Sequence, residues 1–88
     1  MTDPAPRRLS DMRNLGPASE RMLHAAGIRT PKQLDEVGAL EAYRRALAAG
    51  THPSLNLLWS LDAALLDLDW RDLPAGRKAQ LREAVSGL

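Results

Sequence analysis

The segment Leu15-Gly16-Pro17-Ala18-Ser19-Glu20 contains the residue types of an anion-binding helix start. The free N–H groups of a first helical turn and the helix dipole point outward, so a phosphate can dock there. Gly16 allows close approach of a ligand and can supply the positive φ that a tight turn needs. Ser19 adds a hydroxyl donor. The pattern fits a helix-hairpin-helix that contacts the DNA backbone, although the same residues would also serve simply to begin and cap a helix.

Basic side chains gather around this segment. Residues 7–32 contain six basic residues (Arg7, Arg8, Arg13, Arg21, Arg29 and Lys32) and two acidic ones (Asp11 and Glu20), a local net charge of 6 − 2 = +4. The whole chain carries only +1. The local excess predicts that Arg13, Arg21, Arg29 and Lys32 support phosphate binding, whereas the balanced total favours a protein partner.

Other polar residues offer little for metal binding or catalysis. His24 and His52 have no acidic residue at ligand spacing from both, so we expect no metal site. An EF-hand loop from Asp67 would need glycine where Asp72 stands and glutamate where Lys78 stands. We therefore interpret the acids of this segment as loop solvation and as a cap for the Pro74 helix. No nucleophile, phosphate-loop or dinucleotide motif is present, so we expect neither an enzyme nor a cofactor.

Three further residues have both a structural and a chemical interpretation. Asp62 could be a buried acid, but we expect it on the narrow exposed face of a leucine-rich helix. Trp59 and Trp70 could stack nucleobases. Trp59 lies between Leu58 and Leu61, which favours packing in the core, and Trp70 is expected to fold back over the core as a lid.

Composition predicts an all-helical domain. Alanine and leucine supply 14 and 16 of the 88 residues, valine and isoleucine together three, and there is no phenylalanine. Helices favour alanine and leucine, whereas strands favour β-branched and aromatic side chains. With no cysteine, disulfides and thiolate metal sites are excluded. We expect a compact bundle of four or five short helices.

Glycine and proline mark the helix ends. We expect one or two helical turns over residues 8–13, then helices over 17–26, 31–37, 39–49 and 54–68, and a last helix from Pro74 with Leu81, Ala84, Val85 and Leu88 inward. Thr30 and Gln33 form a capping box, with Ile28 placed to contact Leu34. The 54–68 helix is apolar around most of its circumference, which predicts a central position or an interface.

Three segments in order carry a family resemblance: MRNLGPASERMLHAAGIRTPKQLDEVGALEAYRRA, SLNLLWSLDAAL and WRDLP. Together they span roughly residues 9–85 and resemble the C-terminal domain of the TfoX/Sxy family, bacterial regulators of natural competence. The resemblance implies a helical domain over residues 9–88 with a helix-hairpin-helix-like (SAM-like) N-terminal part. The polar, proline-rich start of the chain predicts a disordered tail over 1–8 before it. It also implies a competence or transcription regulator, here without the family's N-terminal α/β domain.

The Asn-Leu-Gly-x-x-Ser turn is similar to the DNA-contacting turn in the C-terminal domain of the α chain of RNA polymerase. That similarity suggests Asn14, Gly16 and Ser19 as phosphate contacts, with Pro17 and Ala18 in place of two lysines. The resemblance implies weak binding to DNA phosphates, or contact with the transcription machinery. The alternative is an interaction or dimerisation module without DNA affinity, in which the Leu55–Leu68 helix contacts a partner or a second copy.

The chain shows no sign of a membrane segment. No apolar run approaches the roughly 20 residues that cross a bilayer, and Asp62 interrupts the best candidate. Residues 1–8 are polar and proline-rich, unlike a secretory signal. We expect a cytoplasmic protein.

Overall fold

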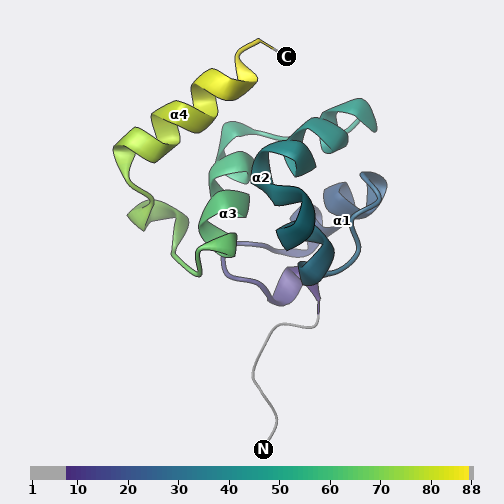
Figure 1. Ribbon diagram of the computed structural model, residues 1–88. Helices are drawn as coiled ribbons and strands as arrows, with labels where there is room; N and C mark the ends of the chain where they lie inside the picture. Colours follow the sequence, from purple (N-terminus) through teal and green to yellow (C-terminus); the bar gives the residue numbers. More distant parts are fainter. Residues whose placement is uncertain (1–7, 88) are drawn as a thin grey trace, which may run out of the picture.

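The computed structural model describes residues 8–87, and every regular element in this range is helical (Figure 1). The order is η1 (Leu9–Asp11), α1 (Pro17–Ala25), α2 (Pro31–Ala48), α3 (Leu55–Leu65), η2 (Trp70–Asp72) and α4 (Ala75–Val85), where η denotes a 3-10 turn. The predicted all-α class is confirmed. The expected tail over 1–8 and the inward placement of Leu88 fall almost wholly outside the described residues.

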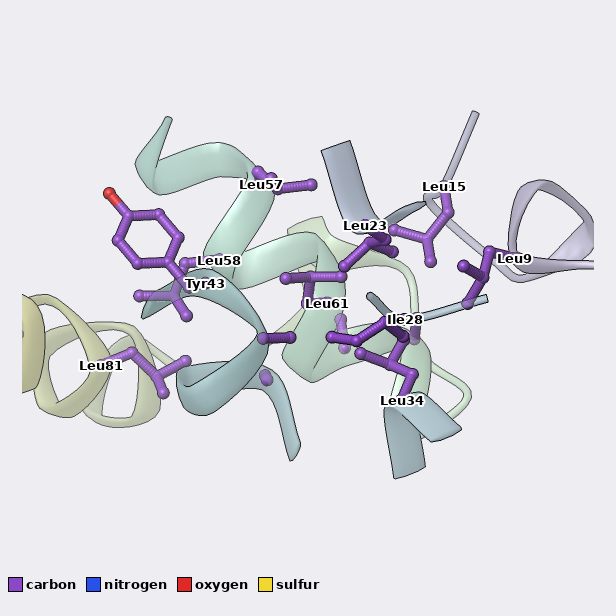
Figure 2. Packing of buried hydrophobic residues seen from close by; sticks show 14 of the residues in the cluster. Leu9, Leu15, Leu23, Ile28, Leu34, Tyr43, Leu57, Leu58, Leu61 and Leu81 are labelled. Carbon is purple, nitrogen blue, oxygen red and sulfur yellow. The ribbon is translucent and has the colours of Figure 1, made fainter. Parts of the chain in front are cut away.

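The connection from α1 to α2 follows the predicted capping pattern. The Gln33 N–H donates to Thr30 Oγ1 at 3.1 Å, and Gln33 Oε1 accepts from the Arg29 N–H at 2.7 Å. In a standard capping box the Gln33 side chain would accept from the N–H of the N-cap residue, Thr30. Here it accepts from the N–H of the residue before it, Arg29. Ile28 and Leu34, on either side of this cap, are both buried (Figure 2). These bonds and the apolar contact direct the chain from α1 into α2.

A kink at Gly38 divides α2. Its φ of 83° and ψ of 164° are non-helical and lie in a region that essentially only glycine adopts. The two helices predicted over 31–37 and 39–49 are therefore two arms of one element, which ends at Ala48. The second arm buries Ala42, Tyr43 and Ala46. The bend lets both arms follow the surface of α3, because a straight helix would carry one of them away from the core.

The helix α3 is the centre of the core. Leu58 and Leu61 are fully buried. Figure 2 shows Leu61 between two groups of side chains, with Leu9, Leu15 and Leu23 on one side and Tyr43 and Leu81 on the other. The sequence predicted that this helix lies either at the centre of the core or at an interface. In the described chain it lies at the centre of the core. Trp59 and Trp70 are partly buried and pack against this cluster, as predicted.

The end of α3 comes earlier than predicted. The helix stops at Leu65, not near Leu68, because Asp67 adopts a left-handed conformation with φ of 56°. The Leu68 N–H then donates to the Ala63 carbonyl at 2.8 Å, as in a Schellman ending. Glycine usually occupies this position, and an aspartate there gives no clear stop signal in the sequence.

Asp62 lies opposite to its expected position. It is only 6% exposed, and its two carboxylate oxygens accept from Arg77 Nε and Nη2 of α4, both at 2.8 Å. The prediction of an exposed Asp62 is therefore wrong, because a partner 15 residues away compensates its burial. α4 lies at the periphery (Figure 1), where Leu81 is buried and Val85 half-buried, but Ala84 is exposed rather than inward.

The kink at Gly38 leads to a stability prediction. Gly38→Ala should lower the free energy of unfolding by about 1–3 kcal/mol, because a Cβ is strained at this φ and ψ. Gly16→Ala is the matched control, since Gly16 has an ordinary φ of −122° and open space around a Cβ. Urea denaturation followed by far-UV circular dichroism measures both. Equal midpoints for the two variants would contradict the kink's dependence on glycine.

Candidate nucleic-acid interface

The start of α1 is open and uncapped. Gly16 is the N-cap residue, no side chain bonds to the first helical turn, and Pro17 occupies the first helical position. A Cβ added at Gly16 would meet nothing within 4 Å. The described chain thus leaves the Cβ position of Gly16 unobstructed.

The positive φ predicted for Gly16 is found instead at Asn14, with φ of 71°. Asparagine tolerates the left-handed region better than most residues, so the turn can form without glycine at that position. The expectation for Gly16 was wrong because two residues of the turn were compatible with a positive φ. Only the path of the chain decides which of them adopts it.

The Asn14 side chain fastens the turn to the loop that follows α3. Its Nδ2 donates to the Leu68 carbonyl at 2.8 Å, and its Oδ1 accepts from the Trp70 N–H at 3.0 Å. Beside it, Arg13 Nη1 donates to the Asp67 carbonyl at 2.8 Å. The Asn14 amide therefore positions the turn, and contact with a phosphate through this side chain would require breaking those bonds.

The segment before the turn is shorter than a full helix. η1 is a single 3-10 turn, and Glu20 of α1 holds it in place. Glu20 Oε1 accepts from Arg8 Nη2 at 2.9 Å, and Oε2 accepts from the Ser10 N–H at 3.2 Å. The Arg8 hydrogen bond, followed by the Ser10 backbone bond, lowers the pKa of Glu20. Sequence analysis missed this buried carboxylate and treated Glu20 only as a charge.

The four basic candidates are all exposed. The ion pairs of the described chain engage other arginines instead: Arg8, Arg44, Arg45, Arg71 and Arg77. Within residues 8–87, Arg13, Arg21, Arg29 and Lys32 thus have no carboxylate within salt-bridge distance. Arg13 is held by the Asp67 carbonyl, whereas the side chains of Arg21, Arg29 and Lys32 have no hydrogen-bond partner among the described residues and are available to an external anion.

These cations do not converge on one point. Arg13 belongs to the Gly16 turn, Arg21 lies within α1, and Arg29 and Lys32 flank the start of α2 (Figure 1). The nine residues of α1 extend about 13 Å and separate the two ends of the set. Ser19, the remaining candidate, is half-buried in the first turn of α1. The four cations are therefore distributed along α1 and beyond its two ends, with Arg13 nearest in sequence to the start of the helix.

The acidic loop after α3 has a local role. The Asp69 side chain accepts from the Arg71 N–H at 2.9 Å and also bonds to its guanidinium, which together lower the pKa of Asp69 to about 2. Asp69 therefore caps η2, and the predicted cap of the last helix is wrong, since Pro74 precedes α4 without a side-chain bond. The described residues contain no group of three His, Asp or Glu side chains that could hold a metal. No helix among them is long and apolar enough to span a bilayer.

Comparison with known proteins gives one family and similar solved structures. The family described as the TfoX C-terminal domain matches residues 5–85. The structure is similar to that of an uncharacterised protein from Listeria monocytogenes in a triclinic crystal form, with 30% identity, a TM-score of 0.85 and 91% of each chain covered. A protein of unknown function from the same organism, in a tetragonal form, has 32% identity and a TM-score of 0.80 over 85% of this chain and 93% of that one. No curated protein sequence matches the chain.

The Asn14 bonds lead to a prediction that separates side chain from backbone. Asn14→Ala should lower the free energy of unfolding by about 2–3 kcal/mol, because it removes two hydrogen bonds and places alanine at a positive φ. Asn14→Gly tolerates that φ but lacks the bonds, so its cost should be about 1–2 kcal/mol. Urea denaturation measures both variants. A wild-type midpoint for Asn14→Gly would mean that the amide does not fasten the turn.

The lowered pKa of Glu20 leads to a prediction about pH. A carboxyl whose pKa is lowered on folding stabilises the fold above its unfolded value, near 4.5, and this stabilisation disappears as the pH falls through the folded value. Glu20→Gln should therefore be less stable than wild type at pH 7, and the difference should shrink as the pH falls below the unfolded value of 4.5 and through the lowered folded pKa. Urea midpoints across that range test this. Glu36→Gln, which removes an exposed carboxyl of α2, is the control.

Proposed function

This chain belongs to the TfoX C-terminal domain family, and from that premise we propose that it is a non-enzymatic regulatory domain of competence or transcription that binds the DNA backbone weakly through the first turn of α1. The observation that carries the proposal is the open, uncapped helix start at Gly16 beside cations that have no carboxylate partner in the described chain. Family membership supports the regulatory role, and the helix start supports the mode of contact.

The donors would come mainly from the backbone. Pro17 has no N–H, so Gly16, Ala18 and Ser19 are the residues whose amides can face a phosphate at this end of α1. The helix dipole places partial positive charge at the same point. Asn14 contributes by holding the turn in shape, and Arg13 and Arg21 flank it. Such contacts recognise phosphate and carry no sequence preference.

The charge balance predicts weak and salt-sensitive binding. The Glu20 carboxylate lies in the same turn of α1, but Arg8 neutralises it at 2.9 Å. The exposed cations of this region (Arg13, Arg21, Arg29 and Lys32) can supply about two to four phosphate contacts. Each contributes about −0.9 to the slope of log affinity against log salt, so we expect a slope of roughly −2 to −4.

The interaction module is the second candidate, and it has a smaller surface to offer. Most of α3 is buried within the chain, so the proposed contact would use its ends, where Leu55 and Leu65 are half-buried and Leu66 is 55% exposed. The exposed side chain of Leu66 is the observation that supports an interaction module, because it offers apolar surface to a partner. Sedimentation at micromolar concentration distinguishes DNA binding from the interaction module. A tight dimer whose mass does not change when DNA is added would favour the interaction module.

Fluorescence anisotropy with a short labelled duplex at about 50 mM salt tests the DNA proposal. We expect binding that weakens with salt as above. Gly16→Ala and Arg21→Gln should each weaken it several-fold, the first by obstructing close approach and the second by removing a cation. Arg45→Gln is the matched control, since it removes an exposed arginine that pairs with Glu41 on α2. Absence of binding at about 100 µM protein, or equal loss in the control, would contradict the proposal.

A further inference from the structure

Two tryptophans and a lysine meet on the side of the molecule where α4 begins. Trp59 comes from α3, Trp70 from η2 and Lys78 from α4. The Lys78 ammonium lies 5.4 Å from the centroid of each indole. All three side chains are half-buried, so each keeps part of its surface open to solvent. The cluster therefore presents aromatic surface and a positive charge together.

A hollow of about 230 Å³ runs beside this cluster along α4. Its lining combines one indole, two alanines and two cations: Trp59, Ala75, Ala79, Lys78 and Arg82. The small side chains of Ala75 and Ala79 leave this space open, because longer side chains at these positions would fill it. The indole of Trp59 thus borders an open space that Lys78 and Arg82 also line.

The charges of the hollow are not neutralised by the described chain. Within residues 8–87, neither Lys78 nor Arg82 has a carboxylate within salt-bridge distance, whereas neighbouring Arg77 is paired with Asp62. Glu83, which follows Arg82 in the sequence, lines a neighbouring hollow on α4 together with Arg82, but the two side chains are not within salt-bridge distance. A ligand that fits this place is anionic and has a flat, polarisable face.

We propose that this hollow, together with the Trp70 ring that shares Lys78 with Trp59, is a binding site for single-stranded nucleic acid, in which a base stacks on an indole of this cluster while Lys78 and Arg82 pair with phosphates. Stacking requires an exposed base face, which a single strand offers and a duplex hides. In the free chain the Lys78 ammonium covers the rings. On binding it moves to a phosphate and the base takes its place.

The site is separate from the first turn of α1 and does not rest on duplex binding there. The two are connected through one loop, because Asn14 bonds to the backbone of Trp70 at 3.0 Å. Their chemistry differs. The α1 turn offers backbone N–H groups to phosphates of either form of DNA, whereas the hollow requires ring faces and therefore selects unpaired bases.

Intrinsic fluorescence reports on this site directly, because the chain has two tryptophans and both belong to it. We expect an oligonucleotide of about ten thymidines to quench the emission saturably at about 50 mM salt, and a matched duplex to quench it far less. Lys78→Gln and Arg82→Gln should each weaken binding about three- to tenfold. Arg45→Gln on α2 should not, and Gly16→Ala should leave the thymidine titration unchanged while it weakens duplex binding.

Several outcomes would overturn the site. These are no quenching at about 200 µM oligonucleotide, equal quenching by an oligoglutamate of the same charge, or wild-type affinity in the Lys78→Gln, Arg82→Gln double variant. Arg82 is exposed, so Arg82→Gln tests the site without disturbing the packing of Trp59. Circular dichroism of each variant confirms that the fold is present. Quenching that is lost only with Gly16→Ala would assign the binding to the α1 turn instead.

Discussion

One side-chain amide joins the two halves of this fold. Asn14 donates to Leu68 and accepts from Trp70, so a turn near the start of the chain is fastened to the loop that leaves the central helix. The start of α1 follows this junction in the chain, and Trp70 of the Trp59, Trp70 and Lys78 cluster is one of its two partners. Loss of the amide would remove two of the hydrogen bonds that connect the turn to the loop and would leave the bond from Arg13 to the Asp67 carbonyl.

The remaining polar ties compensate for a small core and the lack of disulfides. Glu20 holds η1 against α1, and Asp62 holds α4 against α3. In both, a carboxylate that is nearly buried meets an arginine whose outer part is in water. Such pairs contribute modestly to stability, but they decide where the short peripheral elements lie. They also neutralise particular arginines, so the remaining cations determine where an external anion can bind.

The two proposed nucleic-acid contacts follow from different parts of the same design. The α1 turn has free amides because proline and glycine begin the helix without a capping side chain. The hollow beside α4 exists because alanines line its floor and because α4 leans on the core through few apolar residues. Each contact alone is small. A regulator built on them would bind weakly, and its affinity would respond strongly to salt.

The sequence by itself determined the helical class, the N-cap at Thr30 and the break at Gly38, because these depend on composition and on interactions within a few residues. The same kind of pattern also located the basic excess within residues 7–32 and predicted the contact of Trp70 with the core. Only the tertiary structure decided that Asn14, not Gly16, adopts the positive φ, that Asp62 is buried, and that α3 ends at Leu65. The partners of Asn14 lie 54 and 56 residues away and that of Asp62 lies 15 away, and no local periodicity can reveal a hydrogen bond made by chain segments that meet only after folding.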